Sequence, residues 1–203
     1  MNIHSCLCMF LPSPTIPHQF VFMWVPTLLS QEPEGGVPTG CVFSSLMMAI
    51  TMGGLLFPPL YSLFCTLSKT GSSELTASFI YLVGCVSMAV PALCLSGIII
   101  TDGDCFVRII VSFLVMELCV GLFSPVQGTL RSKYVPDAQQ GVILNIFRLP
   151  LNAIVVAGTY ATDHMETSTV FFLVSGCLML ASLLQMSMVF GAKPTVDTSK
   201  KQD

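Results

Sequence analysis

The chain has 203 residues, of which 53% are hydrophobic and only 9% are charged, and its formal net charge is −3. Soluble globular domains carry about 25% charged residues, so this chain has too little charge to cover a surface that faces water. Its eight Lys and Arg residues form no patch, which argues against nucleic acid as a partner. The composition therefore predicts an all-α polytopic membrane protein whose surroundings are a lipid bilayer.

The N-terminal region is apolar but irregular. Three prolines interrupt residues 1–18, which also lack the basic n-region and the small-residue cleavage site of a signal peptide. We interpret them as a leader. Residues 19–30 are apolar but shorter than the ~20 residues that a spanning helix needs. They resemble the second half of a span, and they cross the bilayer only if residues 7–30 form one helix kinked at its prolines.

Five longer apolar segments follow, separated by short polar loops. We predict spans at residues 41–63, 75–99, 106–127, 141–159 and 170–190. With the short first segment they form one transmembrane unit, residues 19–192, followed by a tail at 193–203. The span at 41–63 contains a Gly-Gly and a Pro-Pro pair, which membrane helices tolerate and which predict a kink.

Basic and acidic residues lie in alternate loops of the chain. The loops after the second and fourth segments, and the tail, hold Lys69, Arg131, Lys133, Lys193, Lys200 and Lys201. The alternate loops hold Glu32, Glu34, Asp102, Asp104, Asp163 and Glu166. Because basic loops remain on the cytosolic side of a membrane, the sequence predicts that the C-terminus is cytosolic.

The span at 141–159 carries a polar stripe with an arginine in it. At about 100° per residue, the stripe lies within about 60° of arc, the other faces are apolar, and Gly141 leaves room beside it. Its members are Asn145, Arg148, Asn152 and Thr159. A charge inside the membrane costs roughly 2.5–3.5 kcal/mol, so such a residue is usually paired or faces a polar cavity. Arg148, Asn145 and Asn152 are therefore candidate donors to an anion.

The preceding span carries Glu117 well inside it. On a helix Glu117 shares a face with polar residues and with glycines that permit close approach of a neighbouring backbone. These residues are Ser124, Gln127, Arg131, Gly121 and Gly128. Three interpretations stay open. Glu117 and Arg148 pair to hold two helices together; Arg148 binds an anion, while Glu117 carries a coupling proton or positions Arg148; or Arg148 snorkels to the membrane surface.

Signs of catalysis are absent from the sequence. It contains no nucleophile–base constellation, no Gly-rich phosphate loop and no cofactor motif. Its nine cysteines lack the spacing of a zinc site and do not suggest a disulfide framework. We therefore expect a protein that is not an enzyme and that uses no cofactor or metal.

The run from Glu117 to Asn152 resembles the eukaryotic molybdate-anion transporter family of the major facilitator superfamily. That family has the motifs E-x-x-x-G-x-x-x-P, L-R-x-K-x-[VI]-P and Q-x-G-V-L-N-x-F-R-x-P-L in succession. They correspond here to Glu117, Gly121 and Pro125; to Leu130, Arg131, Lys133, Val135 and Pro136; and to Gln139 or Gln140, Gly141, Val142, Leu144, Asn145, Phe147, Arg148, Pro150 and Leu151, with Ile143 as an extra residue. Residues 20–28, FVFMWVPTL, resemble the family's seventh span, F-V-F-L-W-T-P-V-L.

The resemblance covers about residues 19–192 and carries several implications. It implies the C-terminal six-helix half of a facilitator fold, with its first helix truncated and the substrate site between two halves. It also implies molybdate uptake across the plasma membrane, with Arg148, Asn145 and Asn152 binding the oxyanion. The implied partner is the missing N-terminal half or a full-length copy. The alternative is a non-transporting half that associates or competes with the full-length transporter.

Overall fold

The computed structural model describes residues 23–31, 36–68, 71–98, 105–134 and 164–191, together with 141–142, 145–146, 152–153 and 156–160. Every regular element among these residues is helical. A short helix covers residues 23–29. The long helices are α3 (Thr39–Leu67), α4 (Ser72–Leu95), α5 (Cys105–Tyr134) and α7 (Thr167–Gly191).

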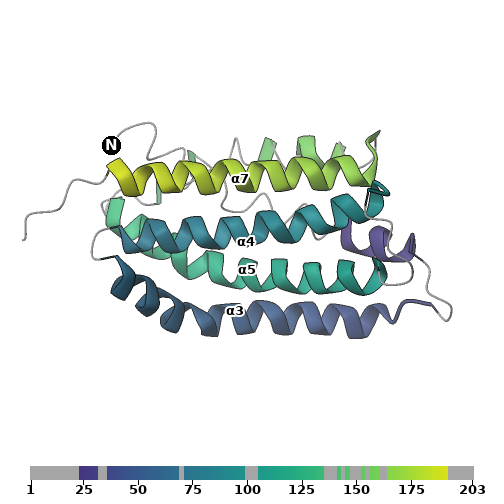
Figure 1. Ribbon diagram of the computed structural model, residues 1–203, viewed down its shortest axis with the longest axis horizontal. Helices are drawn as coiled ribbons and strands as arrows, with labels where there is room; N and C mark the ends of the chain where they lie inside the picture. The colour runs from purple at the N-terminus through teal and green to yellow at the C-terminus, as the bar shows by residue number, and fades with distance from the viewer. Residues whose placement is uncertain are drawn as a thin grey trace, which may run out of the picture.

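The four long helices lie side by side as a bundle, with α4 running opposite to the other three (Figure 1). Helix α4 packs against both α5 and α7, whereas α3 packs mainly against α5. Each helix is long and apolar enough to cross a membrane. This agrees with the prediction of an all-helical polytopic membrane protein. The predicted span at 141–159 and the segment at 19–30 lie only partly within the described residues, so the six-span unit stays a prediction.

The helix ends differ from the predicted bounds, and the differences at the ends of α4 and α5 have a clear cause. Helix α4 ends at Leu95, before the predicted residue 99, because Gly97 adopts φ 70° and so closes the helix in the left-handed conformation that glycine permits. Helix α5 continues to Tyr134. Arg131 and Lys133, which we expected in a loop, therefore lie in its last turn, where cations are favourable next to the helix carbonyls.

Helix α3 runs without interruption through Pro58 and Pro59. Proline lacks the backbone N–H that would close a helical hydrogen bond, and its ring pushes on the preceding turn. Figure 1 shows the C-terminal part of α3 turning away from the line of its first part, as expected for a kinked helix.

Helices α3 and α5 approach each other at glycines. A Cβ atom on Gly53 would lie 2.1 Å from the carbonyl oxygen of Leu118, and one on Gly121 would lie 2.0 Å from the carbonyl oxygen of Ile50. The two backbones are thus in direct contact, which only glycine allows. The predicted close approach is confirmed at Gly121. At Gly128 no described residue lies within 4 Å, so a close approach there stays a prediction.

Helices α4 and α7 are joined by buried hydroxyl groups. The hydroxyl groups of Ser78 and Ser182 lie 3.1 Å apart, and each lies within 3.0 Å of the other residue's carbonyl oxygen. Further along the same interface, the Ser175 hydroxyl donates to the carbonyl oxygen of Cys85 at 3.0 Å. Small hydroxylated residues of this kind let membrane helices pack closely and hydrogen-bond across the interface.

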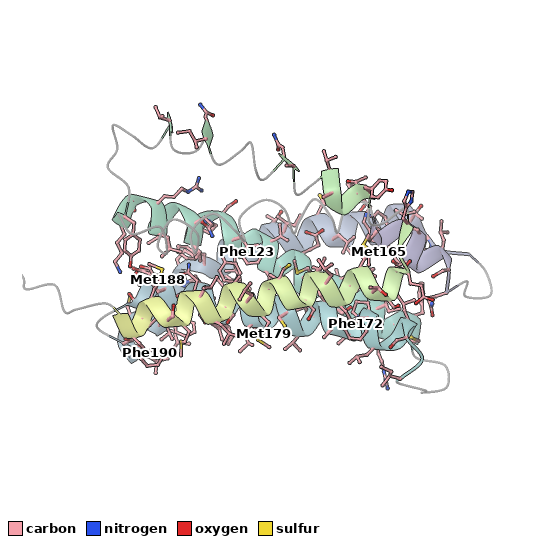
Figure 2. The ribbon with its side chains drawn as sticks, turned by 90° about the horizontal axis from the view of Figure 1, so that it is seen from above. Phe123, Met165, Phe172, Met179, Met188 and Phe190 are labelled. Atoms are coloured by element: carbon pink, nitrogen blue, oxygen red, sulfur yellow. The ribbon has the colours of Figure 1, made fainter. Side chains whose placement is uncertain are left out.

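The outer surface of the bundle is apolar. Figure 2 shows Phe172, Met179 and Phe190 along the outer side of α7, and all three side chains are exposed. Leu55 of α3 is likewise 73% exposed. Exposed apolar side chains in such density suit contact with lipid and would be unfavourable in water.

Candidate functional site

Glu117 lies in the middle of α5 and is only 4% exposed. It precedes, by one turn, the Gly121 contact that brings α3 against α5. Among the described residues, no side chain donates a hydrogen bond to its carboxyl group. Burial of a carboxyl group is costly unless the group is paired or protonated. The predicted partner, Arg148, lies outside the described residues, so the pairing of the two stays a prediction.

Most other polar residues on this face of α5 have partners within the protein. The side-chain amide of Gln127 donates to the hydroxyl of Tyr81 on α4. Arg131 Nε donates to the backbone carbonyl of Gln127 at 3.1 Å. Ser124 is exposed. Gln127 and Arg131 therefore contact neighbouring protein groups, and among the predicted members of this face Glu117 is the candidate for chemistry.

The stripe on the predicted span at 141–159 is described in part. Asn145 and Asn152 both lie in helical pieces, and both are exposed. Thr159 is half-buried and has a partner, while Gly141 is exposed. No described hydrogen bond joins either asparagine to Glu117. The two amide groups are thus open to a ligand, but their assembly with Arg148 into one site stays a prediction.

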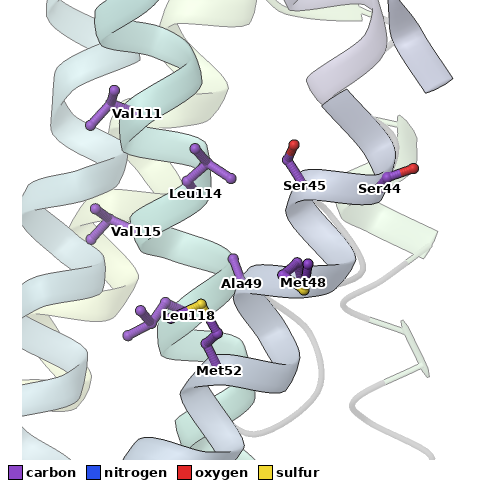
Figure 3. Close-up of a pocket in the computed structure, with 9 residues that line it drawn as sticks. All are labelled: Ser44, Ser45, Met48, Ala49, Met52, Val111, Leu114, Val115 and Leu118. Atoms are coloured by element: carbon purple, nitrogen blue, oxygen red, sulfur yellow. The ribbon is translucent and has the colours of Figure 1, made fainter. Parts of the chain in front are cut away.

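The cavities along α5 are apolar. The one between α3 and α5 has a volume of about 450 Å³, and its polar lining residues are Ser44 and Ser45 (Figure 3). Their hydroxyl groups donate to the carbonyl oxygens of Gly40 and Cys41, at 2.8 and 2.9 Å. The protons of these hydroxyls are therefore already engaged within α3, and the described lining of this cavity offers no free donor to a hydrated dianion.

Two further cavities have the same character. The one between α4 and α5 has a volume of about 660 Å³, and Arg108 is the charged residue among the described residues that line it. Its two serines, Ser87 and Ser112, donate to carbonyl oxygens of their own helices. The third cavity, of about 440 Å³, is lined by Leu, Val, Ile, Pro, Phe and Cys side chains. Among the described residues, Arg108 is therefore the charged donor that these three cavities contain.

A buried ion pair escaped the sequence analysis. Glu74, in the first turn of α4, is fully buried, and Lys133 Nζ of α5 lies 2.6 Å from its Oε1. The Tyr134 hydroxyl donates to the same oxygen. The other carboxyl oxygen of Glu74, Oε2, has no hydrogen-bond partner among the described residues. The pair joins the start of α4 to the end of α5, and it assigns a structural role to the lysine of the L-R-x-K motif.

Replacing Lys133 with methionine is expected to lower the stability of the bundle by roughly 1–3 kcal/mol, because Glu74 then keeps a buried charge with one donor fewer. The expected loss is moderate because the Lys133 side chain is 41% exposed. Adding Glu74→Gln to the Lys133→Met chain is expected to restore part of the lost stability, since a neutral amide needs no cation.

Thermal unfolding in detergent measures both variants. Arg131→Met is the matched control, because the Nε of Arg131 donates to a carbonyl of its own helix. Additive losses in the double-mutant cycle would contradict the coupling of Glu74 and Lys133.

Comparison with known proteins places the chain beside a group of vertebrate transporters. It is 25% identical over 179 residues to the molybdate-anion transporter of Xenopus tropicalis, an alignment that covers 87% of this chain. It is 29% identical over 182 residues to that of Danio rerio and 27% identical over 181 residues to that of Takifugu rubripes, covering 84% of this chain in each case. The chain spans between 35% and 37% of the length of these relatives.

No protein-family model matches the chain, and no solved structure matches it. The relatives nevertheless carry the name that the motifs from Glu117 to Arg148 predicted. The chain is thus similar, along most of its own length, to part of the proteins named molybdate-anion transporter, as its sequence indicated.

Proposed function

We propose that this chain forms part of a major facilitator superfamily carrier that takes molybdate into the cell across the plasma membrane. The observation that carries the proposal is the similarity to molybdate-anion transporters over 84–87% of the chain. The membrane-spanning lengths of α3, α4, α5 and α7 support it. The chain spans about a third of the relatives' length, so the transporting unit includes further protein.

Arg148 and the two asparagines are the proposed anion site. Molybdate is a tetrahedral dianion with four oxygen acceptors. A guanidinium group is planar, stays charged and presents several donors in a fixed fork, so it holds two oxyanion oxygens at once. The amides of Asn145 and Asn152, both exposed, supply neutral donors on the same stripe. Apart from Arg108, the described linings of the three cavities contain no charged donor, which supports this stripe as the candidate for the anion.

Glu117 has two proposed roles. It is buried in α5, and no described side chain donates to it. A carboxyl group in that state is favoured in the neutral, protonated form unless a cation comes close. Glu117 either carries a proton that moves with the anion or accepts a hydrogen bond from Arg148 and so positions its guanidinium.

The proposed orientation places the C-terminus in the cytosol. The ion pair between Lys133 and Glu74 joins the end of α5 to the start of α4. Gly71, just before α4, packs against Val189 near the end of α7. The basic residues Arg131 and Lys133 and the end of α7 thus lie at one end of the bundle, and the positive-inside rule assigns that end to the cytosol.

The other part of the carrier is proposed to cover the site. In transporters built from repeats, the substrate lies near the middle of the bilayer between two halves. This chain supplies one wall. Without a second wall, Asn145, Arg148 and Asn152 would face lipid, where a charge is unfavourable. The expected partner is therefore the missing half or a full-length copy.

A chimera tests the proposal. Residues 19–192 replace the matching segment of the Xenopus tropicalis transporter, and molybdate uptake is measured in cells by elemental analysis, normalised to surface protein. We expect uptake clearly above that of untransfected cells, and none from residues 1–203 expressed alone.

A surface-expressed chimera without uptake would contradict the proposal. If co-expression of residues 1–203 also lowered uptake by the intact frog protein, the result would favour the alternative hypothesis, in which the chain is a non-transporting half that competes with the full-length transporter. Saturable uptake by the 203-residue chain as a monomer would contradict both.

A further inference from the structure

We infer that the groove between α4 and α5 binds one phospholipid, with an acyl chain lying along the groove and the phosphate group at Arg108. The groove is the cavity of about 660 Å³ described above. The inference depends on α4 and α5 spanning a membrane and not on the substrate. The orientation given under the proposed function assigns this lipid to the non-cytosolic leaflet.

The groove is open to the surroundings of the bundle and is apolar. Val86 of α4 and Val107 of α5, which both line it, are 58% and 57% exposed. The hydroxyl groups of its two serines donate to carbonyl oxygens of their own helices, at 2.8 Å in each case. An apolar hollow does not hold water, and an empty one loses packing contacts. In a membrane, the hydrocarbon that can fill it is a lipid acyl chain.

The length of the groove matches one leaflet of a bilayer. Its lining on α4 extends from Leu82, near the middle of the helix, to Cys94, next to its last residue. At a rise of 1.5 Å per residue, this stretch is about 18 Å long. The hydrocarbon core of a bilayer is about 30 Å thick, so one leaflet contributes about 15 Å. The groove therefore extends from the middle of the membrane to one surface, as an acyl chain does.

Arg108 lies at the surface end of the groove. It is in the first turn of α5, is exposed, and is the charged residue among the described residues that line the cavity. A long basic side chain at this depth reaches the headgroup region, where a guanidinium group binds two phosphate oxygens. Arg108 also interacts with another group of the protein. Its five N–H donors are enough for that group and for a phosphate.

The size of the groove favours a lipid chain over a helix of another protein. An α-helix with its side chains is about 10–12 Å wide, so a length of about 18 Å takes up roughly 1,400 Å³ or more. This is about twice the volume of the cavity, which is about 660 Å³. An acyl chain is one methylene group wide and can lie within the groove. A helix could only lie across its opening.

The first test counts the lipids that bind to the full chain. Residues 1–203 are purified in detergent, titrated with phosphatidylcholine and analysed by native mass spectrometry. We expect one phosphatidylcholine to bind more tightly than any further copy. Diacylglycerol with the same acyl chains lacks the phosphate and should bind roughly tenfold more weakly. Arg108→Gln should weaken phosphatidylcholine binding by the same factor and leave diacylglycerol binding unchanged. Arg131→Gln, at the opposite end of α5, is the matched control and should behave like the parent.

The second test locates the acyl chain. A phosphatidylcholine with a diazirine on its acyl chain should label peptides from α4 and α5 in the parent chain. Val86→Trp fills the groove from an exposed position and should remove both this label and the tight binding. Leu173→Trp is the control, because Leu173 is 55% exposed on α7 and does not line the groove. It should change neither measurement.

Three results would overturn the inference. The first is equal binding of the two lipids, or phosphatidylcholine binding that survives Arg108→Gln unchanged. The second is the binding of inorganic phosphate at Arg108 without a tightly bound lipid, which would indicate a site for small anions. The third is the absence of the label on α4 and α5 in the transporting chimera, where another part of the carrier would then cover the groove. The outcome does not depend on molybdate uptake, so its failure is distinguishable from failure of the transport proposal.

Discussion

Arg148→Lys in the transporting chimera is expected to reduce molybdate uptake roughly 10- to 100-fold, while the amount of protein at the surface stays near that of the parent. Lysine keeps the positive charge but presents a single ammonium group, so it cannot hold two oxyanion oxygens in the way that the planar guanidinium fork does. A hydrogen bond to a charged group contributes roughly 1.5–3 kcal/mol, which corresponds to this loss of uptake.

Arg131→Lys is the matched control for this prediction. Arg131 is also an arginine of the motif region, but it donates to the backbone carbonyl of Gln127 in its own helix. We expect the Arg131→Lys chimera to transport nearly as well as the parent. Normal uptake kinetics in the Arg148→Lys protein would instead leave Arg148 a structural residue, and the anion site would have to lie elsewhere.

The pairing and the anion-binding interpretations of Arg148 also predict different effects of substitutions on folding. If Arg148 pairs with Glu117, Arg148→Met leaves an uncompensated buried carboxylate and lowers the folded yield, and Glu117→Gln in the same chain restores part of it. If Arg148 binds only the anion, Glu117→Gln restores nothing. Fluorescence-detected size-exclusion chromatography of the single and double variants measures this yield independently of transport.

Gly121→Ala is expected to destabilise the bundle by about 3 kcal/mol or more, the largest effect that we expect from a single methyl group in this chain. The added Cβ would lie 2.0 Å from the carbonyl oxygen of Ile50 and 3.0 Å from the backbone nitrogen of Gly54. These are backbone atoms, which cannot rotate away as a side chain can. Helices α3 and α5 would have to separate, and each would lose contacts along the crossing.

Gly128→Ala is the control on the same helix. Gly128 is exposed, and a Cβ there would meet no described residue within 4 Å. Alanine restricts the unfolded chain more than glycine does. We therefore expect the free energy of unfolding to rise by less than about 1 kcal/mol. Thermal unfolding of both variants in one detergent measures the difference. Equal melting temperatures would show that α3 and α5 do not cross at Gly121.

Some features of this protein could be predicted from the sequence because they depend on one segment at a time. A long apolar segment in a bilayer satisfies its own backbone hydrogen bonds by becoming a helix, so α3, α4, α5 and α7 follow from length and composition. The burial of Glu117 followed in the same way from its place inside such a segment. The motifs from Glu117 to Arg148 indicated the relatives because those residues lie close together in the sequence.

The contacts between segments were decided only by the tertiary structure. Membrane helices are apolar on nearly all faces, so periodicity gives little indication of which face turns inward. Gln127 was expected on the same face of α5 as Glu117, and the packing of α5 against α4 gives it Tyr81 as a partner, which the sequence did not indicate. The pairing of Glu74 with Lys133 joins residues 59 apart, and that of Ser78 with Ser182 joins residues 104 apart. Both pairings depend on the register and the crossing of the helices, which no single segment encodes.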